Sequence, residues 1–159
     1  MYVIGTEECE NSIEMSFIFS SKDKWVAAIT NHLGAEFVQV SQKTLQAVHL
    51  IVFIRQTLQH LVSSERPIDY HFISTRTAEL TLVGPVVGVE TGRVATGIGS
   101  IVGNKGGVAV GFSLGITSFL FVNSHFTAHQ NFVEQRNRDF HRINTKLKLR
   151  QAGDTGQFV

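Results

Sequence analysis

The sequence predicts an α/β fold. Apolar runs of strand length alternate with segments whose apolar residues recur at helical spacing, and glycine-containing turns separate several of them. The chain has 159 residues, of which 43% are hydrophobic and 17% are charged, and this is enough for one domain with a sizeable core. No internal repeat or low-complexity tract interrupts the alternation.

The N-terminal part predicts a strand and then a helix. Residues 2–5 (YVIG) are expected to form a short buried strand. Residues 20–34 predict a helix that Ser20 or Ser21 caps and that Gly34 ends, because glycine readily adopts the left-handed conformation of a helix stop. The apolar face of this helix is expected to consist of Trp25, Ala28, Ile29 and Leu33.

Four further segments predict strands. EFVQV (36–40) and LQAVHLIVFIR (45–55) come first, and the second is expected to be central in its sheet because it is apolar on both faces. VAVGFSL (108–114) and TSFLFVN (117–123) flank a short turn at Gly115, which predicts an antiparallel hairpin. Residues 64–92 hold both prolines and show no clean period, so they predict a loop or an extra hairpin.

Composition restricts the class of function. The formal net charge is +1, so no overall field attracts nucleic acid or acidic lipid, and an anion site would have to be local. Cys9 is the single cysteine, which favours a reducing, cytoplasmic location. The apolar runs are too short to span a membrane, and the start MYVIGTEE lacks the pattern of a secretory signal.

A glycine-rich segment precedes the hairpin. Glycine at 103, 106 and 107 would let backbone N–H groups approach an anion, and Lys105 adds three donors suited to a phosphate oxygen. The competing interpretation is a glycine-rich lead into a strand with an exposed lysine. The spacing differs from that of a Walker A loop, which opens a helix.

Polar residues follow the second hairpin strand at once. Asn123 and His125 lie where a rigid sheet can hold reactive side chains, and a histidine can donate to a phosphate oxygen or move a proton near neutral pH. A metal pair of His125 and His129 is an alternative, although that spacing suits a helix. Near the N-terminus, Glu7 and Glu8 follow a strand and are of the residue type that holds Mg²⁺.

The last predicted helix covers residues 131–149. Its apolar stripe consists of Phe132, Val133, Phe140, Ile143 and Leu147. Arg136 and Asn137 lie on the same stripe, so they are expected either to point into a polar cleft or pair with a carboxylate, or to extend from the edge of the stripe into water.

Together these segments resemble the inositol polyphosphate 5-phosphatases of the endonuclease/exonuclease/phosphatase superfamily. The resemblance covers nearly the whole chain and rests on five blocks in family order: YVIGTEE, LIVFIR, VATGIGSIVGNKGGVAVGF, FLFVNSHFTAH and EQRNRDFHRI. It implies a four-layer α/β sandwich of the DNase I type. It also implies Mg²⁺-dependent hydrolysis of the 5-phosphate of phosphoinositides or soluble inositol phosphates, with peripheral contact to membranes and no nucleic-acid partner.

The same resemblance assigns roles to individual residues. Glu8 matches the metal-binding glutamate, in a place where the family usually has a QE pair, so Glu7 is a departure of little expected cost. His125 matches the active-site histidine that contacts the scissile phosphate, with Asn123 in the same block. The implied substrate-binding residues are Asn104, Lys105, Arg136 and Asn137.

Other family blocks do not occur in these 159 residues. They are an N-terminal asparagine strand, a W-x-G-D-x-N-x-R block and an S-D-H block that supply further catalytic groups. We therefore expect residues 1–159 to form a partial catalytic domain that is inactive alone, a fragment in which residues 64–87 are an insertion. The alternatives are a non-catalytic remnant that binds phosphoinositide or a protein partner, and a nuclease of the superfamily, against which the absence of a Lys/Arg stripe argues.

Overall fold

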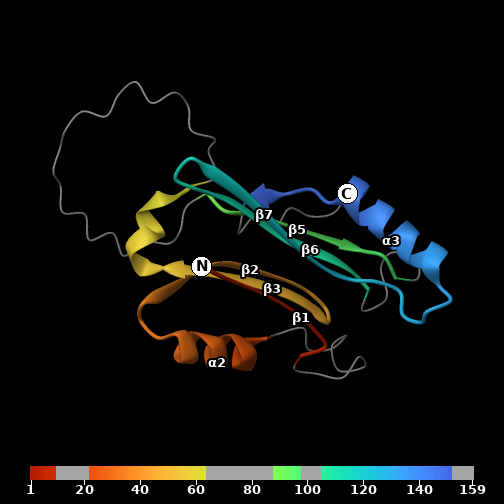
Figure 1. Ribbon diagram of the computed structural model, residues 1–159, viewed down its shortest axis with the longest axis horizontal. Helices are drawn as coiled ribbons and strands as arrows, with labels where there is room; N and C mark the ends of the chain where they lie inside the picture. Colours follow the sequence, from red (N-terminus) through yellow and green to blue (C-terminus); the bar gives the residue numbers. More distant parts are fainter. Residues whose placement is uncertain (10–21, 64–87, 98–104, 152–159) are drawn as a thin grey trace.

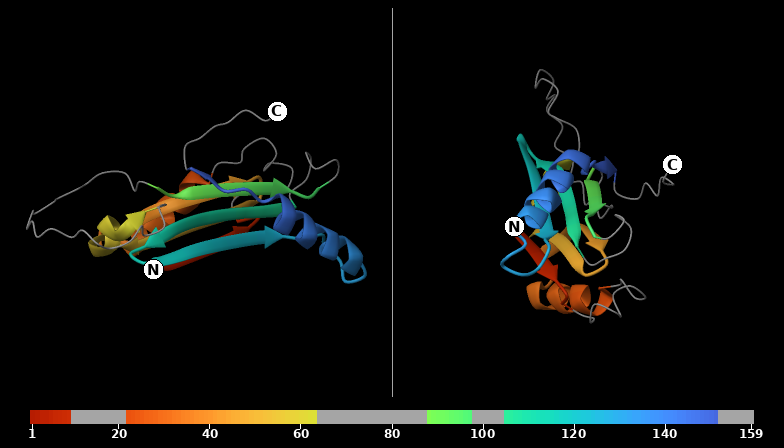
Figure 2. Two further views of the ribbon diagram at one scale, coloured as in Figure 1. Left: turned by 90° about the horizontal axis from the view of Figure 1, so that it is seen from above. Right: turned by 90° about the vertical axis from the view of Figure 1, so that its right-hand side faces the viewer.

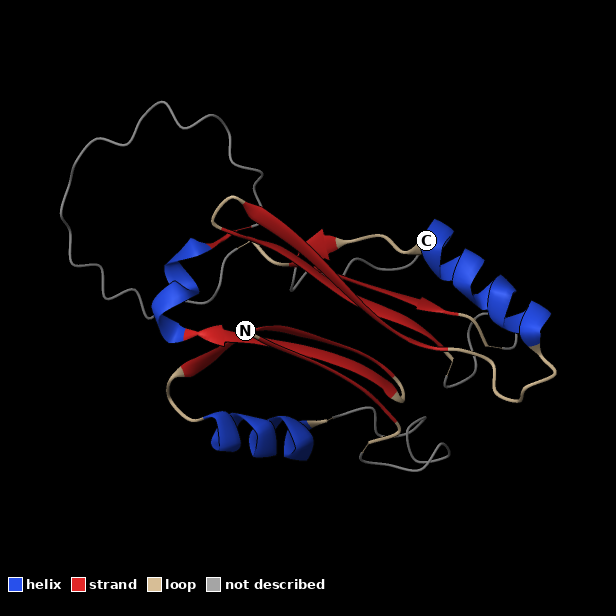
Figure 3. Ribbon diagram, in the orientation of Figure 1, coloured by secondary structure: helices blue, strands red, loops and turns tan. Residues whose placement is uncertain are grey.

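The computed structural model describes residues 1–9, 22–63, 88–97 and 105–151. They form four layers, in which helix α2 covers one antiparallel sheet, a second antiparallel sheet faces the first, and helix α3 lies on the outer side of the second (Figures 1 and 3). This arrangement confirms the predicted α/β sandwich. Within the described residues, no helix is both long and apolar enough to cross a membrane.

The first sheet has the strand order β1-β3-β2. Its strands are β1 (Tyr2–Glu7), β2 (Phe37–Leu45) and β3 (Val48–Arg55). The central position of β3 is confirmed, because it pairs on both sides and only its last residue is exposed. The prediction that β1 is buried is wrong, since Tyr2 and Val3 are 46% and 37% exposed. As an edge strand, β1 pairs with β3 alone.

Helix α2 (Asp23–Leu33) packs on the outer face of this sheet. Ile29 lies against Ile51 and Phe53 of β3, as an apolar helix face predicts. Gly34 ends the helix at φ 69°, which confirms the predicted stop. Ala28 is exposed and Val26 takes its predicted place in the packed face. Lys22 occupies the N-cap position, while Ser20 and Ser21 lie outside the described residues.

The second sheet is built around β6 (Gly106–Leu114). Strand β7 (Thr117–His125) forms a hairpin with it through Gly115 at φ 60°, which confirms the prediction. On the other side of β6 lie β5 (Glu90–Ala95) and the two-residue β4 (Val62–Ser63), which the 3-10 helix η1 (Gln56–Leu61) joins to β3. Strand β8 (Arg150–Gln151) pairs with β5. The predicted insertion, residues 64–87, lies outside the described residues.

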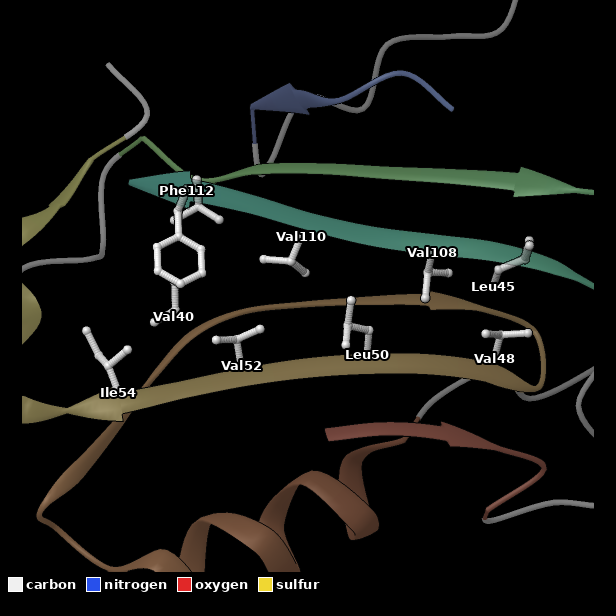
Figure 4. Close-up of a cluster of buried hydrophobic side chains, with 10 residues drawn as sticks. Val40, Leu45, Val48, Leu50, Val52, Ile54, Val108, Val110 and Phe112 are labelled. Carbon is white, nitrogen blue, oxygen red and sulfur yellow. The ribbon is translucent and has the colours of Figure 1, made fainter. Parts of the chain in front are cut away.

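The main core fills the space between the two sheets (Figure 4). Alternate residues of β3 point into it, because successive side chains of a strand lie on opposite faces. The first sheet contributes Val40, Leu45, Val48, Leu50, Val52 and Ile54, and the second contributes Val89, Val108, Val110 and Phe112. This core fixes how the ends of the two sheets lie relative to each other.

Helix α3 (Val133–Lys146) is shorter than predicted, and the predicted apolar stripe is not buried as a whole. Ile143 is buried against Gly107 of β6, but Phe132, Val133 and Phe140 are 41%, 53% and 61% exposed. The reason is visible in Figure 2, where the N-terminal part of α3 extends past the end of the sheets. Only the C-terminal part of the helix has a sheet beneath it.

Candidate functional site

Chemically reactive side chains collect at one end of the facing sheets. Strands β1 and β7 end there, and β6 begins there directly after Lys105. The β6–β7 register places Gly106 opposite His125, so Lys105 and His125 are neighbours across the hairpin. Strand β1 of the first sheet contacts β7 of the second, so the end of β1 lies close to these two residues.

His125 is the centre of this cluster. It is the last residue of β7, and its side chain is 12% exposed. The ammonium group of Lys105 contacts His125 Nε2, and because an ammonium group can only donate, Nε2 is the acceptor of this contact. Nδ1 lies 2.5 Å from Glu7 Oε2, and Nε2 lies 3.6 Å from Glu8 Oε1. The Glu7 contact is close but lacks the geometry of a hydrogen bond, and it becomes an ion pair only when the ring is protonated.

The two glutamates reach the histidine from the end of β1. Glu8 has φ 55°, a left-handed conformation that is costly for a residue other than glycine, and its N–H donates to Ala47 O at 3.0 Å. This turn brings consecutive carboxylates to the same ring, where an ordinary strand would send them to opposite faces. The pKa of Glu7 is raised above its usual value, mainly by burial. The positive charge of Lys105 opposes this rise, and the negative charge of Glu8 adds to it.

Asn123 lies two residues before His125 in β7 and, on the same face of the strand, contacts the other sheet. Its amide nitrogen donates to Thr6 O at 3.1 Å and to His49 O at 3.0 Å. These carbonyls belong to β1 and β3. The described contacts of Asn123 therefore join the two sheets rather than reach into the cluster.

The loop after His125 is fastened by α3. The buried carboxylate of Asp139 accepts from Thr127 N at 2.8 Å and from Thr127 Oγ1 at 2.7 Å. Arg136 donates to the carbonyls of His129 and Gln130, at 2.5 and 3.0 Å. The expected carboxylate partner of Arg136 is thus replaced by backbone oxygens.

The remaining predicted site residues are less informative. Asn137 is exposed on α3, and Asn104 lies outside the described residues together with Gly103. Gly106 and Gly107 have structural reasons to be glycine. A methyl group on Gly106 would lie 2.3 Å from Val94 O, and one on Gly107 would lie 3.0 Å from Ile143. Their contacts support the structural interpretation of these two glycines.

Three residues of this end were not recognised from the sequence. The family resemblance makes Glu7 a departure of little expected cost, and it assigns no role to Gly5 or Asp139. The usable sequence signal for Asp139 is its place four residues before the apolar Ile143, on the same face of the helix. Nothing local distinguished Gly5, because its partner Asn123 is distant in the sequence.

The carboxylates at the end of β1 fit a loosely held divalent cation. Within the described ranges, no three His, Cys, Asp or Glu residues form a group that could enclose a metal ion. Mg²⁺ does not require such a cage, because it is commonly held by one or two carboxylates, water and substrate phosphate. Glu7 and Glu8 supply such carboxylates, and the pKa of Glu7 is raised first by burial and to a smaller extent by the charge of Glu8, which a cation would offset.

Comparisons with known proteins agree with this architecture. Residues 1–158 match the endonuclease/exonuclease/phosphatase family 2. The type II inositol 1,4,5-trisphosphate 5-phosphatase of Mus musculus is 28% identical over 156 residues, which are 96% of this chain and 13% of that protein. Human synaptojanin-1 is 49% identical over 63 residues, 40% of this chain and 4% of that protein.

A solved structure shows the same fold. The inositol polyphosphate 5-phosphatase domain of SPsynaptojanin, in complex with inositol (1,4)-bisphosphate and calcium, superposes with a TM-score of 0.67 at 21% identity. The match covers 94% of this chain and 37% of that domain, so this chain spans only part of the proteins it resembles. With the family match extending over residues 1–158, the chain belongs to the endonuclease/exonuclease/phosphatase family 2.

Proposed function

We propose that the chain carries a Mg²⁺-dependent site for the 5-phosphate of inositol polyphosphates or phosphoinositides. The observation that carries this proposal is the convergence of Glu7, Glu8, Lys105 and His125 at one end of the facing sheets. A cation site, a positive side chain and a histidine together match the needs of phosphomonoester hydrolysis. The substrate class follows the names of the relatives, which are inositol phosphatases.

Glu8 is the proposed main ligand of Mg²⁺, with Glu7 beside it. When bound, Mg²⁺ polarises the phosphoryl oxygens and stabilises charge on the transferring group. The left-handed conformation of Glu8 is the kind of local strain that a functional site retains. Lys105 is the proposed phosphate contact, because an ammonium group acts as a point charge with three donors.

His125 is the proposed proton donor to the scissile phosphate. When Lys105 turns to the anion, Nε2 is released, takes up a proton from water, and can then donate it toward a phosphate oxygen. Glu7 at Nδ1 then stabilises the imidazolium and holds the ring orientation. This assigns Glu7 a supporting role that the sequence did not indicate.

Arg136 and Asn137 remain predicted substrate contacts. What supports a role for Arg136 is indirect, because its described bonds hold the carbonyls of His129 and Gln130. A substrate contact through Asn104 also remains a prediction, as does contact with a membrane surface.

Ligand binding tests the site directly. Calorimetry in the presence of Mg²⁺ should show that the chain binds inositol 1,4,5-trisphosphate about tenfold more tightly than inositol 1,4-bisphosphate, because the extra phosphate occupies the site. Lys105→Ala should remove this difference, and Lys24→Ala, an exposed lysine on α2, should preserve it. Equal affinity for the two ligands, or binding that ignores Mg²⁺, would contradict the proposal.

A non-catalytic phosphoinositide-binding role is the second candidate. The Lys105–His125 cluster favours it, because an ammonium group beside a histidine can bind a phosphate without any further catalytic group. Tight binding without turnover would support that role for the isolated chain. Cleavage of plasmid DNA would instead indicate a superfamily nuclease.

A further inference from the structure

We propose that Asn123 is a positioning residue that fastens the two sheets to each other beside the site, and that Gly5 exists to admit its amide. We call Asn123, its hydrogen bonds to Thr6 O and His49 O, and its contact with Gly5 the clasp. The inference rests on the proposed function only for what the site does, because the contacts themselves are independent of any activity.

The hydrogen bonds of the clasp are the first argument. One amide nitrogen donates to Thr6 O and His49 O, at 3.1 and 3.0 Å, and Thr6 and His49 are directly opposite each other in the β1–β3 ladder. Asn123 therefore ties β7 of the second sheet to two paired strands of the first. Both amide hydrogens are used, so Nδ2 has none left to donate to a phosphate.

The space around the amide is the second argument. A methyl group on Gly5 would lie 2.8 Å from Cγ and 3.0 Å from Oδ1 of Asn123, closer than side-chain atoms normally approach. A side chain at position 5 would thus force the Asn123 amide to move. Gly5 does not have a positive φ. Glycine is therefore required at this position by the lack of space for a side chain and not by the backbone conformation.

The location of the clasp gives it a role in the site. Thr6 immediately precedes Glu7, and Asn123 lies two residues before His125. The 2.5 Å contact between Glu7 Oε2 and His125 Nδ1 spans the same two strands, β1 and β7. Any separation of these strands at the clasp would therefore part the carboxylate from the ring, and displacements of about 1 Å are enough to impair a catalytic site.

A double-mutant cycle tests the space argument in the full chain. Gly5→Ala should lower the urea midpoint of unfolding when Asn123 is present, and it should cause little or no loss in the Asn123→Ala background, where the amide is gone. An equal loss from Gly5→Ala in both backgrounds would overturn the clasp.

Nuclear magnetic resonance tests the positioning role. The wild-type chain should show a cross-relaxation signal between the His125 ring and the Glu7 γ-methylene, and folded Asn123→Ala should lose it. Ser118→Ala is the matched control, because it removes a 3.0 Å Ser113–Ser118 bond that lies within the second sheet, and it should keep the signal. A folded Asn123→Ala variant with the signal intact would overturn the proposal.

A variant that retains the amide covers the case in which Asn123→Ala does not fold. Gly5→Ala displaces the amide by steric contact alone, and it should weaken the His125–Glu7 signal; an unchanged signal would overturn the proposal. None of these readouts requires turnover or ligand. Failure to bind inositol phosphates would therefore contradict the proposed function but not the clasp. An equal effect of Gly5→Ala with and without Asn123 would contradict the clasp but not the proposed function.

Discussion

At the scale of single residues, Lys43 shows what a charge costs at the border of the core. It is directly opposite Leu50 in the β2–β3 ladder and so shares the face that lines the space between the sheets. Arg93 has the same relation to Val108 in the second sheet. Burial, and then the charge of Arg93, lower the pKa of Lys43 from its usual 10.5.

We predict that Lys43→Met stabilises the chain at neutral pH. The folded state binds the Lys43 proton less tightly than the unfolded state, so the charge disfavours folding at low and neutral pH. This penalty is relieved as the pH rises through the lowered pKa toward 10.5, and the stability of the wild type should rise relative to that of the variant. Urea unfolding at a series of pH values measures the difference, and a gap that widens toward alkaline pH would contradict the argument.

At the scale of elements, α3 acts on the site through the loop that it holds. Its contacts with Thr127, His129 and Gln130 come from Asp139 and Arg136, one helical turn apart. Ile143, one helical turn further along, is buried and packs the helix against Gly107 of β6. The helix therefore connects the outer face of the second sheet to the segment that directly follows His125.

We predict that Asp139→Ala destabilises the chain by about 2 kcal/mol, because it leaves the Thr127 N–H and hydroxyl without their shared acceptor. Asp139→Asn, which keeps an acceptor oxygen, should cost less. Glu134→Gln is the control, since its exposed pairing with Arg138 at 3.8 Å contributes only about 0.3 kcal/mol. Equal losses for Asp139→Ala and Glu134→Gln in urea unfolding would show that the loop does not depend on this bond.

At the scale of the whole molecule, two facing sheets position groups that come from distant parts of the sequence. Glu7 and Glu8 arrive on the first sheet, and Lys105 and His125 arrive on the second. Neither sheet holds the complete cluster. The core between the sheets and the Asn123 contact decide whether these four groups act together.

We predict that the isolated 159-residue chain releases no measurable phosphate from inositol 1,4,5-trisphosphate in Mg²⁺. The family blocks that carry further aspartate, asparagine and histidine groups do not occur in these residues, and catalytic groups that act as a unit fail together when some are missing. A phosphate-release assay on the purified chain provides the measurement. Mg²⁺-dependent release that His125→Ala abolishes would show that the groups present suffice.

The sequence predicted features whose signal is local. The continuous apolar run of β3 indicated a central strand, and Gly115 between two apolar runs indicated the hairpin. That hairpin places Gly106 opposite His125 and so accounts for the contact between Lys105 and His125. What could not be predicted depends on the approach of distant segments: which glutamate faces His125 is set by the turn at Glu8, and the exposure of Phe140 is set by where the sheet beneath α3 ends.

Strand β7 has a consequence for how the protein behaves in concentrated solution. Among the described strands, only β6 pairs with it, and the exposed Leu120 and Val122 alternate along it at 57% and 46% exposure. A row of backbone donors and acceptors without strand partners, flanked by apolar side chains, is a template for adding another strand. Self-association through this edge should therefore increase with protein concentration. Because β7 also carries Asn123 and His125, oligomers formed there would cover or distort the site.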